Sequence, residues 1–290
     1  MNKHIGRAAV VAVAATLCLA PAAPGGGGKQ KVRDDEIRLF NGRNLDGWDT
    51  WLGKPYKGDK VIGLNNDPKK VFSVVNFEGQ PAIRISGEVF GALTTQQEYE
   101  NYSVRLEFKW GKKKWPPREK PERDSGLLYH CTGKHGAAGT FWMQSLECQI
   151  MENHCGDFWC VAGTSADVRA TPLNPKFPFS AIRYDPKGKT YRVPRHIDFD
   201  ETEQDDFHVV KRELNELLNG WNTIEVQTVG TTSVHIVNGK ANMVLTNARC
   251  RVKGLEEPLK RGKIQLQSEG AEVYYRNIVL RPITSFSVKK

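Results

Sequence analysis

The chain has 290 residues, of which 39% are hydrophobic, including 12 Phe, 8 Tyr and 7 Trp. This is enough apolar material to build a core, so a globally disordered chain is excluded. The formal net charge of +9 at pH 7 raises the question of a nucleic-acid partner. Part of the excess lies in local runs such as Lys112–Lys114 and Lys289–Lys290, and no basic helix or nucleic-acid-binding motif accompanies it. We therefore expect no nucleic-acid partner.

The N-terminal segment has the features of an export signal. A basic start (Lys3, His4 and Arg7) precedes an apolar run from Ala8 to Ala20, and small residues follow at Ala20–Ala22. The run of about 13 residues is short for a membrane span. We expect a signal peptide at residues 1–23, a flexible Gly-rich spacer at 24–35, and a secreted or periplasmic protein with no stable membrane span.

The six cysteines bear on both anchoring and cross-linking. A retained membrane anchor and a lipoprotein carried on Cys18 are the alternatives to secretion, although Leu17 stands where a lipoprotein signal has a small residue. An oxidising compartment permits disulfides among the other five, and their odd number leaves at least one thiol unpaired. Their spacing lacks the paired C-x2-C pattern of zinc modules. These five are Cys131, Cys148, Cys155, Cys160 and Cys250.

Short alternating runs from residue 71 onward predict β-strands. In the clearest run, Tyr102–Trp110, Tyr, Val, Leu, Phe and Trp share one face, and Ser, Arg, Glu and Lys share the other. Asn238-Gly239 after a strand at Ser233–Val237 predicts a hairpin. The other expected strands are Val71–Val75, Ala82–Ile85, Gly126–His130, Ser145–Met151, Trp221–Val229, Lys263–Gln267 and Glu272–Leu280.

Helix is scarce, and the best candidate is Lys211–Leu218, ended by Asn219-Gly220. Many short strands with little helix favour an all-β fold, a β-sandwich or jelly roll. No later apolar run approaches a membrane span, and no linker follows residue 30, so we expect one domain at 36–285. The expected long loops are Gly111–Arg123, Cys131–Thr140 and Thr171–Pro194.

The segment Ser145–His154 carries the strongest chemical pattern, E-x-Q-x-x-E. In a strand, Glu147 and Gln149 project to one face, and Glu152 falls on the other unless a bulge re-aims it. The pattern resembles the E-x-D-x-x-E strand of concanavalin-like glucanases, in which two carboxylates flank a glycosidic bond. Because Gln149 replaces the middle Asp, an ordinary half-exposed strand with surface carboxylates is the alternative.

Acidic, imidazole and indole side chains surround this segment. Glu147, Glu152 and His154 are the candidate catalytic residues, and the same three could hold a divalent cation such as Mn, Ca or Zn. An Arg on a sugar-facing strand could donate to a sugar oxygen or hold a carboxylate ionised, although a structural salt bridge is the alternative for Arg276. The candidate substrate-binding residues are Asp124, His130, Gln149, Trp159 and Arg276.

Six motifs in order resemble the 3-keto-disaccharide hydrolase domain family, from about Ile37 to Pro282. They match the family patterns L-F-N-G-x-x-L-x-G-W, N-S-G-[IL] with Asp for Asn, E-x-Q-[IL], W-N-x, N-G, and G-x-I-x-L-Q followed by V-x-[FY]-R-N-I. The matching segments begin at Leu39, Asp124, Glu147, Trp221, Asn238 and Gly262.

The resemblance implies a concanavalin A-like lectin/glucanase sandwich and a carbohydrate substrate. For some members it implies cleavage of 3-keto-glycosides, in which a base removes the C2 proton that the C3 ketone makes acidic and the C1 substituent then leaves. We therefore expect a hydrolase or lyase of 3-keto-glycosides. The alternatives are a noncatalytic carbohydrate-binding module and a retaining glycosidase that uses Glu147 and Glu152. The sugar, the linkage and the oligomeric state do not follow from the sequence.

Overall fold

A computed structural model describes residues 35–173, 182–194, 209–211 and 213–287. The predicted signal peptide lies outside these residues, as does the spacer up to residue 34, so both stay predictions. The secondary structure of the described residues consists of strands, with no helix, which confirms the all-β prediction. Among these residues, no helix is long and apolar enough to cross a membrane.

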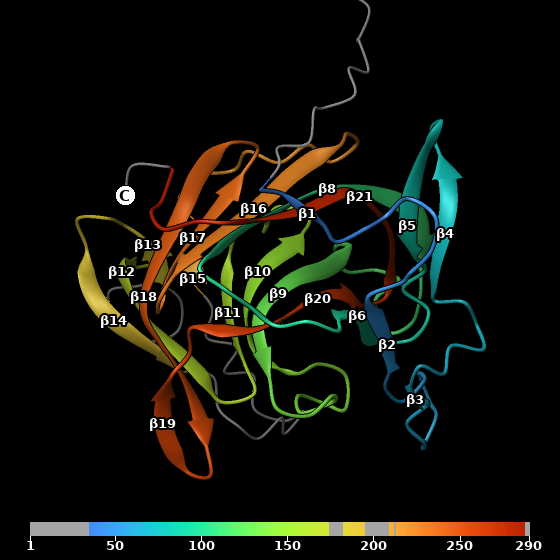
Figure 1. Ribbon diagram of the computed structural model, residues 1–290, viewed down its shortest axis with the longest axis horizontal. Helices are drawn as coiled ribbons and strands as arrows, with labels where there is room; N and C mark the ends of the chain where they lie inside the picture. The colour runs from blue at the N-terminus through green and yellow to red at the C-terminus, as the bar shows by residue number, and fades with distance from the viewer. Residues whose placement is uncertain (1–34, 174–181, 195–208, 212, 288–290) are drawn as a thin grey trace, which may run out of the picture. The chain divides into compact units, whose positions relative to one another are not determined.

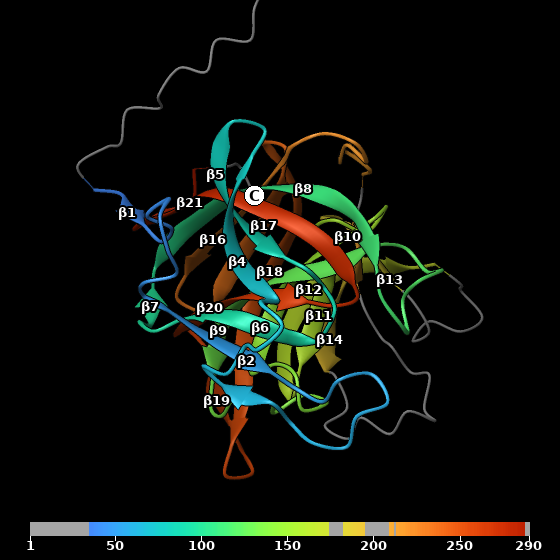
Figure 2. The same cartoon turned by 90° about the vertical axis from the view of Figure 1, so that its right-hand side faces the viewer.

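Two layers of antiparallel strands pack face to face (Figures 1 and 2). The front layer consists, in order, of β2 (Trp48–Leu52), β6 (Gly91–Thr95), β20 (Arg261–Ser268), β9 (Asp124–Thr132), β10 (Gln144–Met151) and β11 (Phe158–Val161). The back layer consists of β4 (Phe72–Phe77), β5 (Gln80–Ile85), β21 (Ala271–Pro282), β8 (Tyr102–Lys114), β16 (Asn222–Val229), β17 (Thr232–Val237) and β18 (Lys240–Val252).

The layers join along one side, where β18 pairs with β12 (Thr164–Pro172). From there β13 (Ile182–Tyr184) and β15 (Val209–Val210) lead to β11, while β14 (Lys189–Pro194) pairs antiparallel with β12. The remaining short strands are β1 (Ile37–Arg38), β3 (Gly63–Leu64), β7 (Tyr99–Glu100) and β19 (Leu255–Pro258). Together these strands form the all-β sandwich that the sequence predicted.

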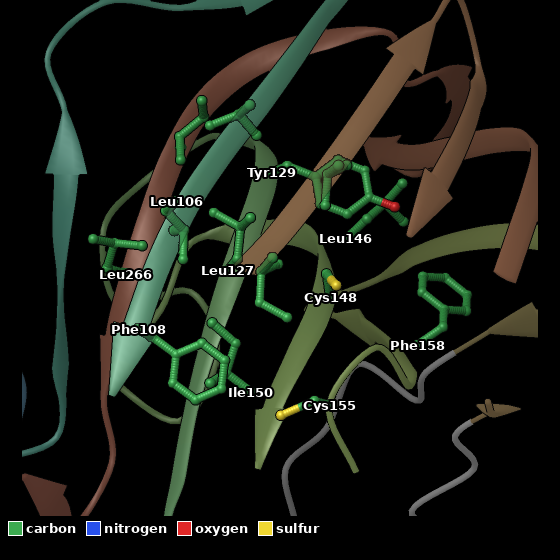
Figure 3. Packing of buried hydrophobic residues seen from close by; sticks show 14 of the residues in the cluster. Leu106, Phe108, Leu127, Tyr129, Leu146, Cys148, Ile150, Cys155, Phe158 and Leu266 are labelled. Atoms are coloured by element: carbon green, nitrogen blue, oxygen red, sulfur yellow. The ribbon is translucent and has the colours of Figure 1, made fainter. Parts of the chain in front are cut away.

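The core lies between the layers, and its side chains come from alternate positions of each strand (Figure 3). Leu127 of β9, Leu146 of β10 and Leu266 of β20 meet Leu106 and Phe108 of β8 in one buried cluster. Because the period of a strand is two, the residues between these positions must point to the outer faces. The packing of this core therefore decides which side chains the front layer presents outward.

The expected strands are all present, each within a few residues of its predicted bounds. The hairpin at Asn238-Gly239 is also confirmed, since both residues have the positive φ that a tight turn between β17 and β18 requires. All three expected loops are partly strand: β8 continues to Lys114, β9 continues to Thr132, and Thr171–Pro194 contains β13 and β14. Strands with mixed polar sequences, such as β12 and β18, gave no period-two signal, and their pairing partners hold them in place.

The predicted helix at Lys211–Leu218 is wrong, because its described residues form an irregular loop. Side chains of the neighbouring strands take up the backbone groups that a helix would use. The amide of Asn222 accepts a hydrogen bond from the Leu217 N–H and donates one to the Leu217 carbonyl, while the Asn238 amide donates to the Asn215 carbonyl. Tertiary hydrogen bonds thus override a weak local preference.

The five cysteines outside the predicted signal peptide are all buried, and none of them forms a disulfide with another described residue. Burial raises the pKa of the Cys131, Cys148, Cys155 and Cys250 thiols, so these four remain protonated at neutral pH. The structure therefore contains none of the disulfides that an oxidising compartment would permit.

Two buried histidines should make the fold sensitive to acid. Burial lowers the pKa of His130 from 6.5 to about 3 and that of His235 from 6.5 to about 4, so both stay neutral in the folded protein where the unfolded chain would take up protons. The free energy of unfolding should therefore fall as the pH drops below 6.5, by about 1.4 kcal/mol per pH unit for each histidine, and level off below the folded-state pKa.

Urea unfolding between pH 7.5 and pH 5 measures this slope. His130→Asn is a suitable variant because Asn tolerates the positive φ of 53° at this position. The variant should lower the slope by about one bound proton. Equal slopes for the parent, His130→Asn and His235→Asn would contradict the assignment.

Candidate functional site

The outer face of the front layer carries the candidate site. Along β10, Leu146, Cys148 and Ile150 point into the core, so Glu147 and Gln149 project from the opposite side, as the alternation of the sequence predicts. Both are nearly buried, with Glu147 4% and Gln149 5% exposed. A carboxylate that neighbouring side chains shield from bulk water in this way is suited to strong electrostatic interaction with a ligand.

The flanking strands supply the neighbours of Glu147. Residues directly opposite each other in an antiparallel pair share a face, and Glu147 lies opposite Trp159 of β11 and Leu128 of β9. Gln149 lies opposite Gly126 in the same register. The half-buried Trp159 therefore places an indole ring next to the carboxylate, a pairing suited to stacking on a sugar while a charged group acts on it.

Gly126 lets two polar side chains meet on this face. A Cβ atom built at Gly126 would lie 2.2 Å from Glu147 Oε1 and 2.3 Å from Gln267 Oε1, so any side chain here would displace both groups. Gln267 comes from β20 and is also buried, and its Oε1 has no hydrogen-bond partner among the described residues. We call the set formed by Asp124, Gly126, Glu147, Gln149, Trp159 and Gln267 the Glu147 face.

A buried ion cluster borders the Glu147 face. Arg118, in the loop between β8 and β9, forms ion pairs through Nη2 with Asp124 Oδ2 at 2.7 Å and with Glu269 Oε1 at 3.0 Å, and it donates a hydrogen bond to Glu269. Burial raises the pKa of Asp124 well above its ordinary value, and Glu269 adds to this shift, while Arg118 opposes it. Burial also acts to lower the pKa of Arg118, but Glu269 and Asp124 outweigh it and raise that pKa. The guanidinium therefore remains charged among the buried carboxyl groups.

Glu152, a predicted catalytic residue, lies apart from the Glu147 face. It follows β10 in a turn, where Arg123 donates to its carboxylate from the backbone N–H at 2.8 Å and from Nε at 2.9 Å. Burial opposes ionisation of this group, but the hydrogen bonds from Arg123 lower its pKa below the ordinary value. A carboxylate held in this ion pair fixes the loop end and is poorly placed to act as a general acid.

Two predicted histidines also lie elsewhere. His130 is 1% exposed and packs against the rings of Tyr102 and Tyr129, so it cannot contact a sugar without opening the core. His154 is more accessible, and its Nδ1 lies 2.9 Å from Asp157 Oδ2, a hydrogen bond that raises the pKa of the imidazole. The predicted sugar contact of His130 is therefore not supported, and His154 belongs to the turn after β10.

Arg276, predicted to face the sugar, lies on the outer face of the back layer. Its side chain shares a face with Tyr274, as the alternation indicates, and its Nε donates to Glu107 Oε2 at 2.8 Å. The guanidinium also lies over the ring of Trp221, 3.7 Å from its centroid. These contacts correspond to the structural salt bridge, which was the alternative interpretation of this residue.

The three predicted metal ligands do not come together. Glu152 is held by Arg123, His154 by Asp157, and Glu147 stands on the face of β10. Across the residues that the structure describes, no group of three or more His, Cys, Asp or Glu side chains is arranged to hold a metal ion. The predicted ligand set therefore does not fit a metal.

Sequence reasoning identified Glu147, Gln149, Asp124 and Trp159 but did not assign a role to Arg118 or Gln267. Arg118 lies in the loop that the sequence singled out as long, and Gln267 ends the G-x-I-x-L-Q motif. The charges of this long loop are the sequence signal that points to Arg118. Their convergence with Asp124 depends on the pairing of β9 with β20, which the sequence does not specify.

Comparisons with solved structures found several similar chains. The crystal structure of a candidate glycosyl hydrolase from Parabacteroides distasonis ATCC 8503 shares 19% identity over 86% of this chain and 99% of its own, with a TM-score of 0.45. The β-glucanase of Bacillus licheniformis shares 12% identity over 81% of this chain and 92% of its own (TM-score 0.39), and the carbohydrate-binding module CBM66 of Bacillus subtilis shares 8% over 81% and 95% (TM-score 0.40).

A comparison with curated protein sequences gave no match. At the level of families, the 3-keto-alpha-glucoside-1,2-lyase-like domain matches residues 35–281, most of the chain and all of the strands described above but the last residue of β21. The sandwich, the E-x-Q strand on its outer face and this match lead to one conclusion: the chain belongs to the family of 3-keto-alpha-glucoside-1,2-lyase-like domains.

Proposed function

We propose that the chain cleaves 3-keto-glycosides by elimination, with Glu147 as the base. The observation that carries the proposal is the pairing of a nearly buried carboxylate, Glu147, with the ring of Trp159 on the outer face of the front layer. Family membership supports a carbohydrate-processing enzyme. The position of Glu147 next to Trp159 supports the finer assignment of a proton-transferring group beside a bound sugar.

The elimination reaction requires two groups from the protein: a base and a hydrogen-bond donor. Glu147 takes the proton from C2, the C–H electrons form a C2=C3 double bond, and negative charge collects on the former ketone oxygen. Return of these electrons forms C1=C2 and restores the ketone while the C1–O bond breaks, and the leaving oxygen takes up a proton. Addition of water across C1=C2 then gives the free 3-keto sugar.

The neighbours of Glu147 suit the binding of a sugar ring. Trp159 offers an apolar surface for stacking, and Gln149 is a buried amide on the same face. The Gln149 Oε1 accepts a hydrogen bond from the Ile150 N–H at 3.0 Å, which fixes the amide and directs its Nε2 donor away from the backbone. We infer that this donor binds a sugar hydroxyl.

The two alternatives are less well supported. A retaining glycosidase needs a second carboxyl group that can donate a proton, and Glu152 is held by Arg123 away from the Glu147 face. A binding module has no need to bury a carboxylate at its ligand face, because desolvating that charge costs free energy without adding to stacking. In the elimination mechanism, by contrast, the buried carboxylate of Glu147 acts as the base.

Glu147→Gln should remove most turnover while keeping the fold, because it replaces a base with an amide that cannot take a proton. A loss of about 100-fold or more is expected for a general base. The assay is cleavage of a synthetic 3-keto-glucoside by purified protein, with thermal unfolding measured alongside. The same glycoside without the ketone should not be cleaved.

Glu152→Gln is the matched control, since it makes the same chemical change five residues along the chain. It should lower the melting temperature by breaking the ion pair with Arg123, and it should keep turnover close to the parental rate. Parental turnover in a folded Glu147→Gln variant would show that another group is the base.

Gly126→Ala should act through Glu147. The added Cβ would press on Glu147 Oε1 and Gln267 Oε1, while the strand itself accepts alanine because Gly126 is not in the left-handed region. Turnover should fall about 10- to 100-fold through misplacement of the base. In the double variant with Glu147→Gln, the two losses should be far from additive. Full additivity would mean that Gly126 acts elsewhere.

We further propose that the protein is exported and that the mature chain begins between Ala22 and Gly25, as the small residues after the apolar run indicate. N-terminal sequencing of protein from a periplasmic or secreted fraction measures the start. A chain that begins at Met1, or one that carries lipid on Cys18, would contradict this proposal.

A further inference from the structure

The elimination proposed above needs a positive group at the C3 oxygen, where negative charge develops after the C2 proton leaves. A fixed cation or hydrogen-bond donor at such an oxygen lowers the barrier, because it stabilises the charge in the transition state more than in the bound substrate. Neither Gln149 nor Trp159 carries a positive charge. The side chain that fills this role should be a cation close to Glu147.

We propose that Arg118 is this group: its guanidinium holds the 3-keto oxygen and stabilises the enolate formed when Glu147 removes the C2 proton. The inference rests on the proposed function. Arg118 lies at the border of the Glu147 face, and the negative charge of Glu147 is among those that favour its charged form. A base and an electrophile on the same face are what proton abstraction next to a ketone requires.

The hydrogen bonds of Arg118 leave part of its guanidinium available. Both ion pairs, to Asp124 and Glu269, are made through Nη2. Among the described residues, none accepts a hydrogen bond from its Nε or Nη1, and the side chain is 27% exposed. A guanidinium presents five N–H donors in one plane, so two carboxylates on one side leave donors for a ligand on the other.

The backbone around Arg118 is anchored to the rest of the fold. The Arg118 N–H donates to the Trp115 carbonyl at 2.8 Å, and the Trp115 N–H donates to the Gly270 carbonyl at 2.8 Å. The indole of Trp115 donates to the Ser86 carbonyl at 2.9 Å. A long charged side chain normally loses rotamer entropy when it binds a ligand, and this anchoring reduces that loss before the substrate arrives.

Asp124 and Glu269 are then positioning residues. Their carboxylates fix the guanidinium from one side and keep it protonated in spite of its burial. This explains why Asp124, predicted to bind substrate directly, points one oxygen at Arg118 instead. The family motif that the sequence resembles has Asn at this position, and Asp124, unlike Asn, can form an ion pair with Arg118.

The test isolates proton abstraction from cleavage. In D2O, the full-length protein with a methyl 3-keto-glucoside, whose leaving group is poor, should exchange the C2 proton for deuterium, which NMR measures directly. Arg118→Gln should slow this exchange about 100-fold or more, the loss typical of a single oxyanion donor. Binding of the ordinary methyl glucoside, measured by calorimetry, should change little, because that sugar has no ketone for Arg118 to hold.

Two further variants keep the test decisive if Arg118→Gln fails to fold. Arg118→Lys keeps the charge beside Asp124 and Glu269 and should retain part of the exchange rate. Arg118→Gln combined with Asp124→Asn also removes the negative charge of Asp124, which Arg118 no longer balances, and should be as slow as Arg118→Gln. Arg123→Gln is the matched control, because it removes a neighbouring Arg from an ion pair away from the Glu147 face and should exchange at the parental rate.

Parental exchange in folded Arg118→Gln, or in the Arg118→Gln/Asp124→Asn variant, would overturn the inference and leave Glu147 as the base. Loss of exchange from the parent protein on treatment with a chelator, with recovery on adding Mn, Ca or Zn, would also overturn it, because a metal would then stabilise the enolate. No exchange and no cleavage by the parent protein would instead overturn the proposed function, and this inference with it.

Discussion

The Glu147 face depends on the balance of charge around one guanidinium. Asp124, Glu147 and Glu269 are all nearly buried; Arg118 forms ion pairs with Asp124 and Glu269, and the negative charge of Glu147 also favours the charged form of Arg118. Carboxylates without a counter-charge would be costly in such surroundings, since desolvation alone is worth several kcal/mol for each ion. The loop between β8 and β9 therefore contributes to the face as much as the strands do, because it carries Arg118 to the carboxylates.

The sandwich supplies the other half of the arrangement. Core packing against β8 fixes which residues of β9, β10 and β20 point inward, and the period of two then fixes which point outward. A slip of one residue in β10 would move Glu147 into the core and Cys148 onto the face. The same apolar contacts that hold the fold together thus hold the base in place.

The sequence was informative where alternation alone decides the outcome. The strand at Ser145–Met151 and the shared face of Glu147 and Gln149 follow from a local pattern that the core enforces. Arg118 and Gln267 could not be assigned in this way, since they reach the face from a loop and from a strand distant in sequence. Glu152 misled for the opposite reason: its spacing suits a two-carboxylate site, but Arg123 ties it to the loop end. The helix expected at Lys211–Leu218 was likewise displaced by amide side chains of other strands.

The five buried thiols have a practical consequence for the life of the chain. Because none of these five forms a disulfide with another described residue, the sandwich can form without any oxidation step, in a reducing cytosol as well as outside it. Cys148, Cys155 and Cys160 are fully buried in the core between the layers, so a thiol reagent can alkylate them only when that core opens. The rate at which a thiol reagent labels these core cysteines therefore reports how often the core opens.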